Sequence, residues 1–251
     1  MEFSHLWPWI GLGLAAMLLL GLTVGDMRGD RAVPRTRDMV WLAWAATAAY
    51  LLHQFEEHGI DARGAPYAFR GTLCTSFGFA SAAACPIPDS FITAVNIPVV
   101  WLAGPIAALL GRRWPAIALS YFSVPTVNAF AHIGPAFATG SYNPGLLTAV
   151  LLFLPLSLWT LWVALRRPDL GWRIVAATIV GGIVVHAVLI LTLRAFLMGS
   201  LGENTLVAIQ IVNPAIPILL VAAVMRRPHA PWSAGYEKQP ATFKIRRGRQ
   251  E

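Results

Sequence analysis

The segment HQFEEH, residues 53–58, places two adjacent glutamates and two histidines directly after the apolar run 40–52. In a helix, His53, Glu56 and Glu57 stand at i, i+3 and i+4 and therefore share one face. Adjacent carboxylates repel each other unless a cation or a shared proton separates them. Histidine is a common co-ligand for such a cation. The segment therefore predicts a polar centre, with metal binding as its chemistry, inside an otherwise apolar helix.

The surrounding composition is that of an integral membrane protein. The 251-residue chain is 57% hydrophobic and only 12% charged, whereas soluble domains carry about 25% charged residues. A spanning helix needs about 20 mostly apolar residues. The sequence predicts an all-α, polytopic transmembrane helix bundle of one domain, residues 1–225, followed by a flexible basic tail, 226–251. The expected spans are 5–25, 38–58, 91–111, 114–138, 145–165, 172–198 and 202–225.

The distribution of basic residues predicts the orientation of this bundle. Most of the 19 Lys and Arg residues lie in 26–37, 112–113, 166–173 and the tail, which are on one side of a seven-span arrangement. By the positive-inside rule, the amino terminus is outside and the carboxyl terminus is cytoplasmic. The same placement explains the net charge of +7 without a nucleic-acid partner. We expect a multi-pass protein of the cell membrane, with the lipid bilayer as its partner.

The orientation brings polar residues of three predicted spans to similar depths. Spans 38–58, 114–138 and 172–198 all run outward, and a helix rises about 1.5 Å per residue. His53, Asn128 and His186 then lie roughly 21–22 Å from the starts of their spans, and His132 lies roughly 27 Å from its start. These residues are therefore expected to meet in the outer half of the membrane.

This residue set predicts a divalent metal site, for which we favour zinc and keep iron as the alternative. His53, His132 and one carboxylate, Glu56 or Glu57, are the expected ligands, and His186 is a further candidate. The second carboxylate is expected to act as general base toward water. Asn128 is expected to orient a carbonyl group or to stabilise an oxyanion. The alternative is a buried hydrogen-bond network that joins the helices.

Three short motifs resemble the signatures of one family. HQFEE (53–57), NAFAH (128–132) and YNPG (142–145) occur in order and resemble the H-x-x-E-E, N-x-x-x-H and Y-x-P-G motifs of the HXXEE domain family. The resemblance covers about residues 40–200 and implies an integral membrane protein whose polar motifs serve an enzymatic function, without naming a reaction. The residues that carry over are His53, Glu56, Glu57, Asn128, His132, Tyr142, Pro144 and Gly145.

Three further features bear on the site. The YNPG segment predicts a turn that starts the next helix, with the Tyr142 hydroxyl as a candidate donor over the site. The long loop 59–90 holds Cys74 and Cys85, which can pair in an oxidising compartment or remain as free thiols. VNPAIP (212–217) predicts a broken helix, a feature also found in transporters.

The sequence favours an intramembrane metal-dependent hydrolase that acts on a lipid-like or small hydrophobic substrate near the outer leaflet. A non-haem iron oxidoreductase with the same His and Glu ligands is one alternative. A proton-coupled transporter, with Glu56 and Glu57 as its protonatable pair, is the other.

Overall fold

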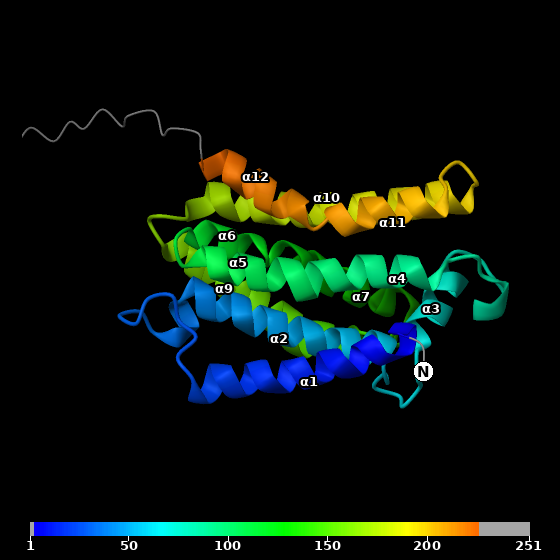
Figure 1. Cartoon of the computed structure of the whole chain (residues 1–251), viewed down its shortest axis with the longest axis horizontal. Helices are drawn as coiled ribbons and strands as arrows, with labels where there is room; N and C mark the ends of the chain where they lie inside the picture. Colours follow the sequence, from blue (N-terminus) through cyan, green and yellow to red (C-terminus); the bar gives the residue numbers. More distant parts are fainter. Residues whose placement is uncertain (1–2, 226–251) are drawn as a thin grey trace, which may run out of the picture.

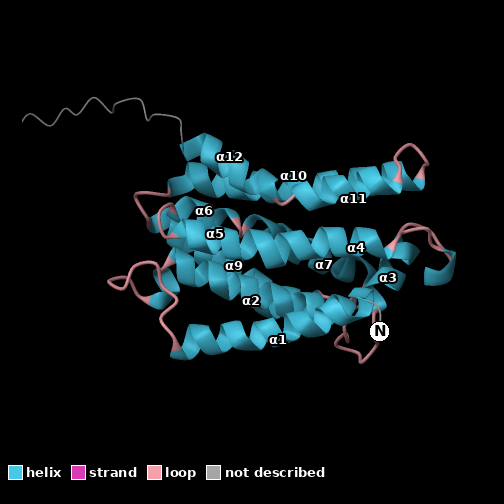
Figure 2. Cartoon of the chain, viewed as in Figure 1, coloured by secondary structure: helices cyan, strands magenta, loops and turns pink. Residues whose placement is uncertain are grey.

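The computed structural model describes residues 3–225, and throughout this part the regular structure is helical (Figure 2). The predicted basic tail, 226–251, lies outside the described residues. The elements up to the middle of the chain are α1 (Phe3–Val24), η1 (Arg35–Arg37), α2 (Met39–His58), α3 (Ala68–Ser76), η2 (Ala82–Ala84), α4 (Asp89–Ile97), η3 (Pro98–Ala103) and α5 (Gly104–Gly111). The remaining elements are α6 (Pro115–Ser120), α7 (Ser123–Thr139), α8 (Leu146–Thr148), η4 (Ala149–Phe153), α9 (Leu154–Arg166), α10 (Gly171–Leu197), α11 (Glu203–Val212) and α12 (Ala215–Met225).

Each of the seven predicted apolar runs is helical, and every end lies within two residues of its predicted position. Two runs contain a wider π-helical turn, η3 between α4 and α5 and η4 between α8 and α9. Such turns occur frequently at functional sites. The predicted break in the last run is confirmed, because α11 and α12 meet at an angle of 41°. Pro214 lies at this break and has no backbone N–H to continue the helix.

Among the described residues, five helices are long and apolar enough to cross a membrane, or six if the bent pair α11 and α12 forms one span. Five or six long apolar helices among the described residues are typical of an integral membrane protein. Helix α2 has 20 residues, but it is not one of the five, and its last turns carry the HQFEEH segment. The total of seven spans and the orientation of the termini stay predictions.

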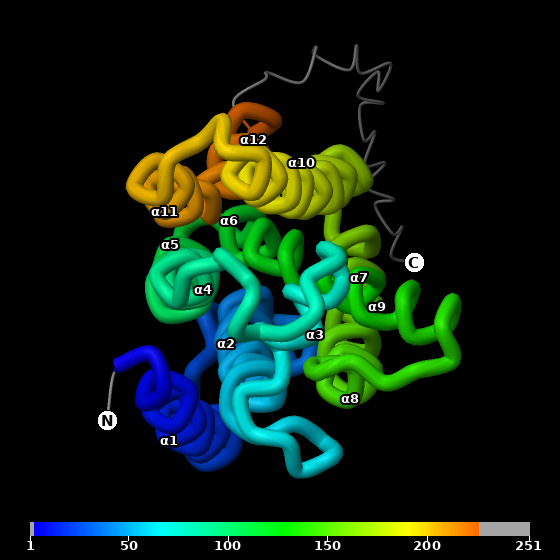
Figure 3. The backbone as a smooth tube through the Cα atoms, turned by 90° about the vertical axis from the view of Figure 1, so that its right-hand side faces the viewer, coloured from blue at the N-terminus to red at the C-terminus, as the bar shows by residue number. Residues whose placement is uncertain are grey.

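The long helices run side by side along one axis (Figure 1). Seen end-on, α2 occupies the middle of the bundle, with α1, α4 and α8 around it (Figure 3). Most of α2 is therefore buried, including its polar end. A central position lets α2 present one face to α7 and the α8 region, where the second and third motifs lie.

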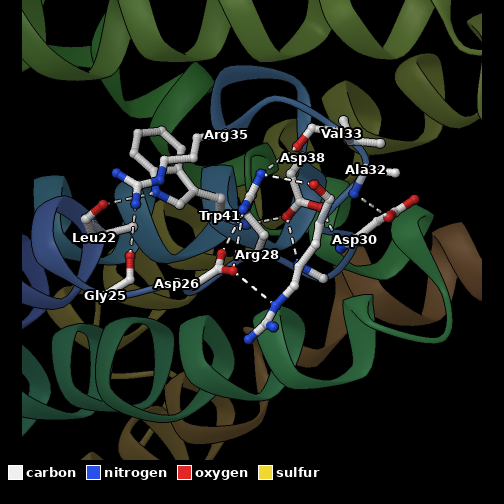
Figure 4. Close-up of polar contacts among 12 residues, drawn as sticks. Leu22, Gly25, Asp26, Arg28, Asp30, Ala32, Val33, Arg35, Asp38 and Trp41 are labelled. Carbon is white, nitrogen blue, oxygen red and sulfur yellow. Dashed lines mark hydrogen bonds and ion pairs between the residues drawn. The ribbon is translucent and has the colours of Figure 1, made fainter.

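The arginine-rich connections gather at one end of the bundle, at the left of Figure 1. There the buried Asp38 carboxylate accepts hydrogen bonds from the backbone N–H groups of Gly29 (3.0 Å), Asp30 (2.9 Å) and Trp41 (2.8 Å), as Figure 4 shows. Arg35 donates to the carbonyl oxygens of Thr23 and Gly25. These contacts hold the connection 25–38 across the ends of α1 and α2. The segregation of positive charge expected from the sequence is thus present in three dimensions.

The opposite end is closed by the connection between α2 and α4, which contains α3 and η2. Cys74 and Cys85 form a disulfide within it, so of the two predicted alternatives the structure has the paired one. Cys74 belongs to a small apolar cluster that also contains Trp7, Phe91 and Leu206. The connection is therefore packed onto α1, α4 and α11 and forms a fixed cover at this end.

Candidate metal centre

The carboxylate of Glu57 lies at the centre of the polar cluster. Nε2 of His132 is 3.2 Å from Glu57 Oε1, and Nε2 of His53 is 3.5 Å from Glu57 Oε2. One ligand atom each from His53, Glu57 and His132 lie within 4.8 Å of one another. All three residues are buried, with relative exposures of 0%, 4% and 7%. Two come from successive turns of α2 and the third from α7, so packing of these helices assembles the group.

The tautomer of His53 follows from its hydrogen-bond partners. Its Nδ1 lies 2.8 Å from Thr148 Oγ1, and the same hydroxyl donates to Glu56 Oε2. A hydroxyl has one hydrogen to donate, so Thr148 accepts from His53, and His53 Nδ1 carries the proton. Nε2 of His53 is then an unprotonated lone pair, and this atom has no hydrogen-bond partner. It points toward the Glu57 carboxylate.

His132 is fixed in the same way by Asn143. The Asn143 amide nitrogen donates to the main-chain oxygen of His132 at 3.0 Å, which identifies the other amide atom as oxygen. That oxygen, Oδ1, lies 2.7 Å from His132 Nδ1, so Nδ1 donates the hydrogen bond. Nε2 of His132 is therefore also left as a lone pair, facing Glu57.

Two nitrogen lone pairs and a carboxylate thus converge in a buried space. This arrangement is unfavourable unless a cation or a shared proton lies between them. Metal-binding histidines donate their other ring N–H to an oxygen acceptor, which orients the ring and raises its basicity. His53 and His132 both have such an acceptor. Two imidazoles and one carboxylate are a donor set for catalytic zinc and for non-haem iron, so the residues fit the metal that the sequence implies.

Glu56 points away from this centre and into the start of α8. Its two oxygens accept hydrogen bonds from the Tyr142 hydroxyl, the Leu147 and Thr148 backbone N–H groups, and the Thr148 hydroxyl. The free N–H groups at a helix start attract a carboxylate in this way. The two adjacent glutamates of the motif therefore occupy different environments: Glu57 faces the histidines, and Glu56 ties α2 to the segment 142–148.

The YNPG motif supplies the floor of the cluster. Gly145 has φ +93°, and a Cβ built on it would lie 2.7 Å from Cε1 of both His53 and His132. Only glycine adopts this backbone conformation readily and leaves this space free. The predicted turn is confirmed, and the structure adds that the glycine packs directly against the two imidazoles.

Tyr142 belongs to the connection between α7 and α8. Its hydroxyl donates to Glu56 Oε1 at 2.9 Å and accepts from the Ala62 backbone N–H at 3.0 Å. Burial raises the pKa of the phenol above its ordinary value, so Tyr142 remains a donor at neutral pH. The predicted hydroxyl is thus present beside the site, and its contact is with Glu56 rather than with Glu57.

The other predicted residues line a cavity that begins at this cluster. Glu57, His132, Asn128 and His186 all contribute to the wall of a space of about 250 Å³. Asn128 lies one helical turn before His132 on α7, and its buried Oδ1 has no hydrogen-bond partner. His186 Nδ1 is bonded to the carbonyl oxygen of Gly182. Of the five residues predicted as metal ligands, the structure gathers His53, Glu57 and His132 into one group, while Glu56 and His186 lie outside it.

Two residues of the site, Asn143 and Thr148, were not singled out from the sequence, and a third, His58, was noted in HQFEEH but not assigned to the site. Asn143 occupies the variable position of the YNPG motif, and Thr148 lies three residues after its glycine. His58, whose Nε2 is 3.4 Å from Glu57 Oε2, belongs to the HQFEEH segment but not to the motif. Proximity to a motif was the available signal for all three. The contacts of Asn143 and Thr148 join residues 11 and 95 positions apart, whereas His58 contacts its neighbour in sequence.

The comparison with protein families agrees with the three motifs. No curated protein and no solved structure matches this chain. Residues 44–160 match the family model described as "Protein of unknown function with HXXEE motif", and this range contains the HQFEE, NAFAH and YNPG segments. It is shorter than the predicted extent of about 40–200. The predicted resemblance is confirmed, because residues 44–160 match the HXXEE family model.

Proposed function

We propose that the protein is an intramembrane metal-dependent hydrolase of the cell membrane. The observation that carries this proposal is the convergence of two oriented imidazoles, His53 and His132, on the Glu57 carboxylate. We assign the metal to these three residues and favour zinc. A bound divalent metal would supply Lewis acidity toward a water or a carbonyl oxygen in the cavity.

The division of roles between the glutamates follows from their surroundings. Glu57 lines the cavity, whereas Glu56 does not. Glu56 already accepts four hydrogen bonds from Tyr142, Leu147 and Thr148. We therefore assign Glu56 a positioning role, together with Tyr142, and Glu57 the role of the carboxylate that faces the substrate. This assignment differs from a general base at Glu56, which the sequence left open.

The cavity favours an apolar substrate. Its wall is mostly aliphatic and aromatic, and Asn128 supplies an amide beside His132 for a carbonyl or other polar group. A substrate of this kind partitions into the bilayer. We propose a lipid-like or small hydrophobic substrate that reaches the centre from the outer leaflet.

The same donor set supports one alternative function. Two histidines and one carboxylate are also the ligands of mononuclear non-haem iron oxygenases. The identity of the bound metal separates the two: zinc favours hydrolysis, and iron favours oxidative chemistry.

Metal analysis of the detergent-purified full chain tests the proposal. We expect close to one zinc or iron per chain, loss of that metal in His53→Ala and His132→Ala, and retention in His5→Ala, which changes an exposed histidine. Hydrolysis of p-nitrophenyl octanoate should fall together with the metal content. A folded protein that binds neither metal, and that moves protons in a vesicle assay, would contradict the hydrolase and support the transporter alternative with Glu56 and Glu57.

A further inference from the structure

The cavity beside the metal centre contains polar groups that the proposed hydrolysis leaves without a role. Its apolar wall includes Phe69, Phe91, Val99 and Leu189, from α3, α4, η3 and α10. The volume of about 250 Å³ is small for a ligand site, since such pockets usually measure about 300–1,000 Å³. The space suits one alkyl chain better than a complete two-chain lipid.

Helices α7 and α10 approach each other closely at one point next to the cavity. A Cβ at Gly182 on α10 would lie 2.1 Å from the Ser123 carbonyl oxygen on α7, so a larger residue would force the helices apart. Val185 and His186, about one turn later, already line the cavity. The absence of a side chain at Gly182 thus brings the helices together directly below the open space.

An opening of the cavity lies between these two helices. Ala131 on α7 and Ile190 on α10 line the cavity and are also exposed at the molecular surface. The two helices are neighbours in the end-on view (Figure 3). Their adjacent residues Phe130 (57% exposed) and Leu191 (64% exposed) are large and apolar. The opening therefore faces the kind of surface that contacts lipid.

The first unexplained polar atom in the wall is Nε2 of His186. Nδ1 of this residue is 2.8 Å from the Gly182 carbonyl oxygen. Because a carbonyl oxygen only accepts, Nδ1 carries the proton, and Nε2 is an acceptor. His186 is not part of the group that can hold a metal, so its lone pair is free for another partner in the cavity.

The second is Oδ1 of Asn213, at the break between α11 and α12. Asn213 is 3% exposed, and its amide nitrogen donates to the Val185 carbonyl oxygen (3.0 Å) and to Gln210 Oε1 (3.3 Å). These bonds fix the orientation of the amide. Oδ1 is buried and has no hydrogen-bond partner. Asn213 is part of the cavity wall, so a donor on a ligand bound there is placed to satisfy this buried acceptor.

We propose that the cavity binds a single-chain amphiphile whose polar group donates hydrogen bonds, with Asn213 Oδ1 and His186 Nε2 as its acceptors and the opening between α7 and α10 as its entry. Two acceptors need two donors, which a 1,2-diol or an amino group supplies and an ether does not. This inference depends on the proposed function in one respect, namely that the bound amphiphile is the substrate that the cavity presents to Glu57 and His132. It gives the broken helix at 212–217 a role in recognition.

Photolabelling of the full chain in lipid nanodiscs tests the inference. The probes are a diazirine-bearing dodecane-1,2-diol and its dimethyl ether, which share the chain and differ in the two donors. We expect the diol to label peptides of α7, α10 and α11 about 25-fold more than the ether, because each of the two net hydrogen bonds supports about fivefold. His186→Phe should lower this ratio to about fivefold while ether labelling stays unchanged, and Asn213→Leu should do the same.

Two tryptophan variants of α7 provide the matched control. Ala131→Trp fills the opening and should remove most labelling, whereas Ala138→Trp, on the same helix, exposed and outside the cavity wall, should leave it intact. Equal labelling by diol and ether, or labelling insensitive to Ala131→Trp, would overturn the inference. Metal analysis of the same unmodified full chain separates the two proposals, because selective labelling of a chain that binds neither zinc nor iron would retain this inference and reject the hydrolase.

Discussion

The α-carbon of Gly145 packs against the imidazole of His53, so closely that a Cβ would lie 2.7 Å from His53 Cε1. The same Cβ would lie 2.7 Å from Cε1 of His132 and 3.0 Å from Glu57 Cγ. The third family motif therefore supports the first two directly, through the absence of a side chain. It connects a turn outside the long helices to all three proposed ligands.

Gly145→Ala is expected to remove metal binding. The added methyl group must displace both imidazoles, and the positive φ adds a backbone cost of roughly 1–2 kcal/mol. Gly140→Ala is the matched control, because Gly140 also has a positive φ, +65°, but no atom lies within 4 Å of its Cβ position. Metal content and thermal unfolding of both variants provide the measurement. Equal metal loss in the two variants would show that backbone strain, and not contact with the histidines, is responsible.

Thr148→Val is expected to weaken metal binding about 10–100-fold, as loss of a residue that orients a ligand does. The valine removes the acceptor for His53 Nδ1 and a donor to Glu56. Thr148→Ser keeps the hydroxyl and should restore affinity. Thr160→Val, which removes a buried hydroxyl bonded to the Leu156 carbonyl oxygen on α9, should have no effect on zinc affinity measured by competition with a chelator. Unchanged affinity in Thr148→Val would contradict the assigned tautomer of His53.

The two glutamates are expected to respond differently to the same substitution. Glu57→Gln should abolish hydrolysis and reduce metal content, because Glu57 lines the cavity and contributes an oxygen to the cluster. Glu56→Gln introduces a donor where four donors already point, so it should mainly lower stability, by about 1–3 kcal/mol. Metal content, turnover and unfolding of both variants are compared. If Glu56→Gln kept full stability but lost all turnover, Glu56 would be the general base and not a positioning residue.

Tyr142 should contribute a specific loss of stability at high pH. Burial raises the pKa of its phenol in the folded chain, whereas an unfolded tyrosine ionises near pH 10. Above about pH 10 the unfolded state binds fewer protons, so the free energy of unfolding falls as pH rises. Tyr142→Phe lacks the ionisable phenol, so its thermal midpoint should decline less between about pH 8 and pH 11. Tyr67→Phe, at the same end of the bundle, serves as control; an unchanged alkaline decline in Tyr142→Phe would refute the expectation.

Periodicity on one helix was sufficient to predict that His53 and Glu57 share a face, since i and i+4 spacing is a local property of the helix. The same reasoning placed Asn128 beside His132. Counting residues from the ends of the predicted spans placed the two pairs at a similar depth in the membrane. In the structure, His53, Glu57 and His132 form one cluster, and Asn128 lines the cavity beside it. The helical runs themselves were predictable because each apolar run must satisfy its own backbone hydrogen bonds in a bilayer.

Depth could not determine which way each side chain points around its helix axis. His186 lies at the expected level, yet its ring nitrogen bonds the Gly182 carbonyl and the residue stays outside the metal group. Likewise, adjacent positions on a helix differ by about 100° in direction, so Glu56 and Glu57 face different neighbours. Only the packing of α8 against α2 decided that Glu56 would take the free N–H groups at the start of α8.

Residue types and spacing alone were enough to predict the apolar helical runs, their bounds and the polar motif residues that lie on common helix faces. These features depend on composition and on spacing within one helix, where the geometry is repetitive. The tertiary structure decided the ligand group, the tautomers set by Thr148 and Asn143, the role of Gly145 and the acceptors of the cavity. Those depend on contacts between residues as many as 95 positions apart, which arise only when the rotation and separation of packed helices are fixed.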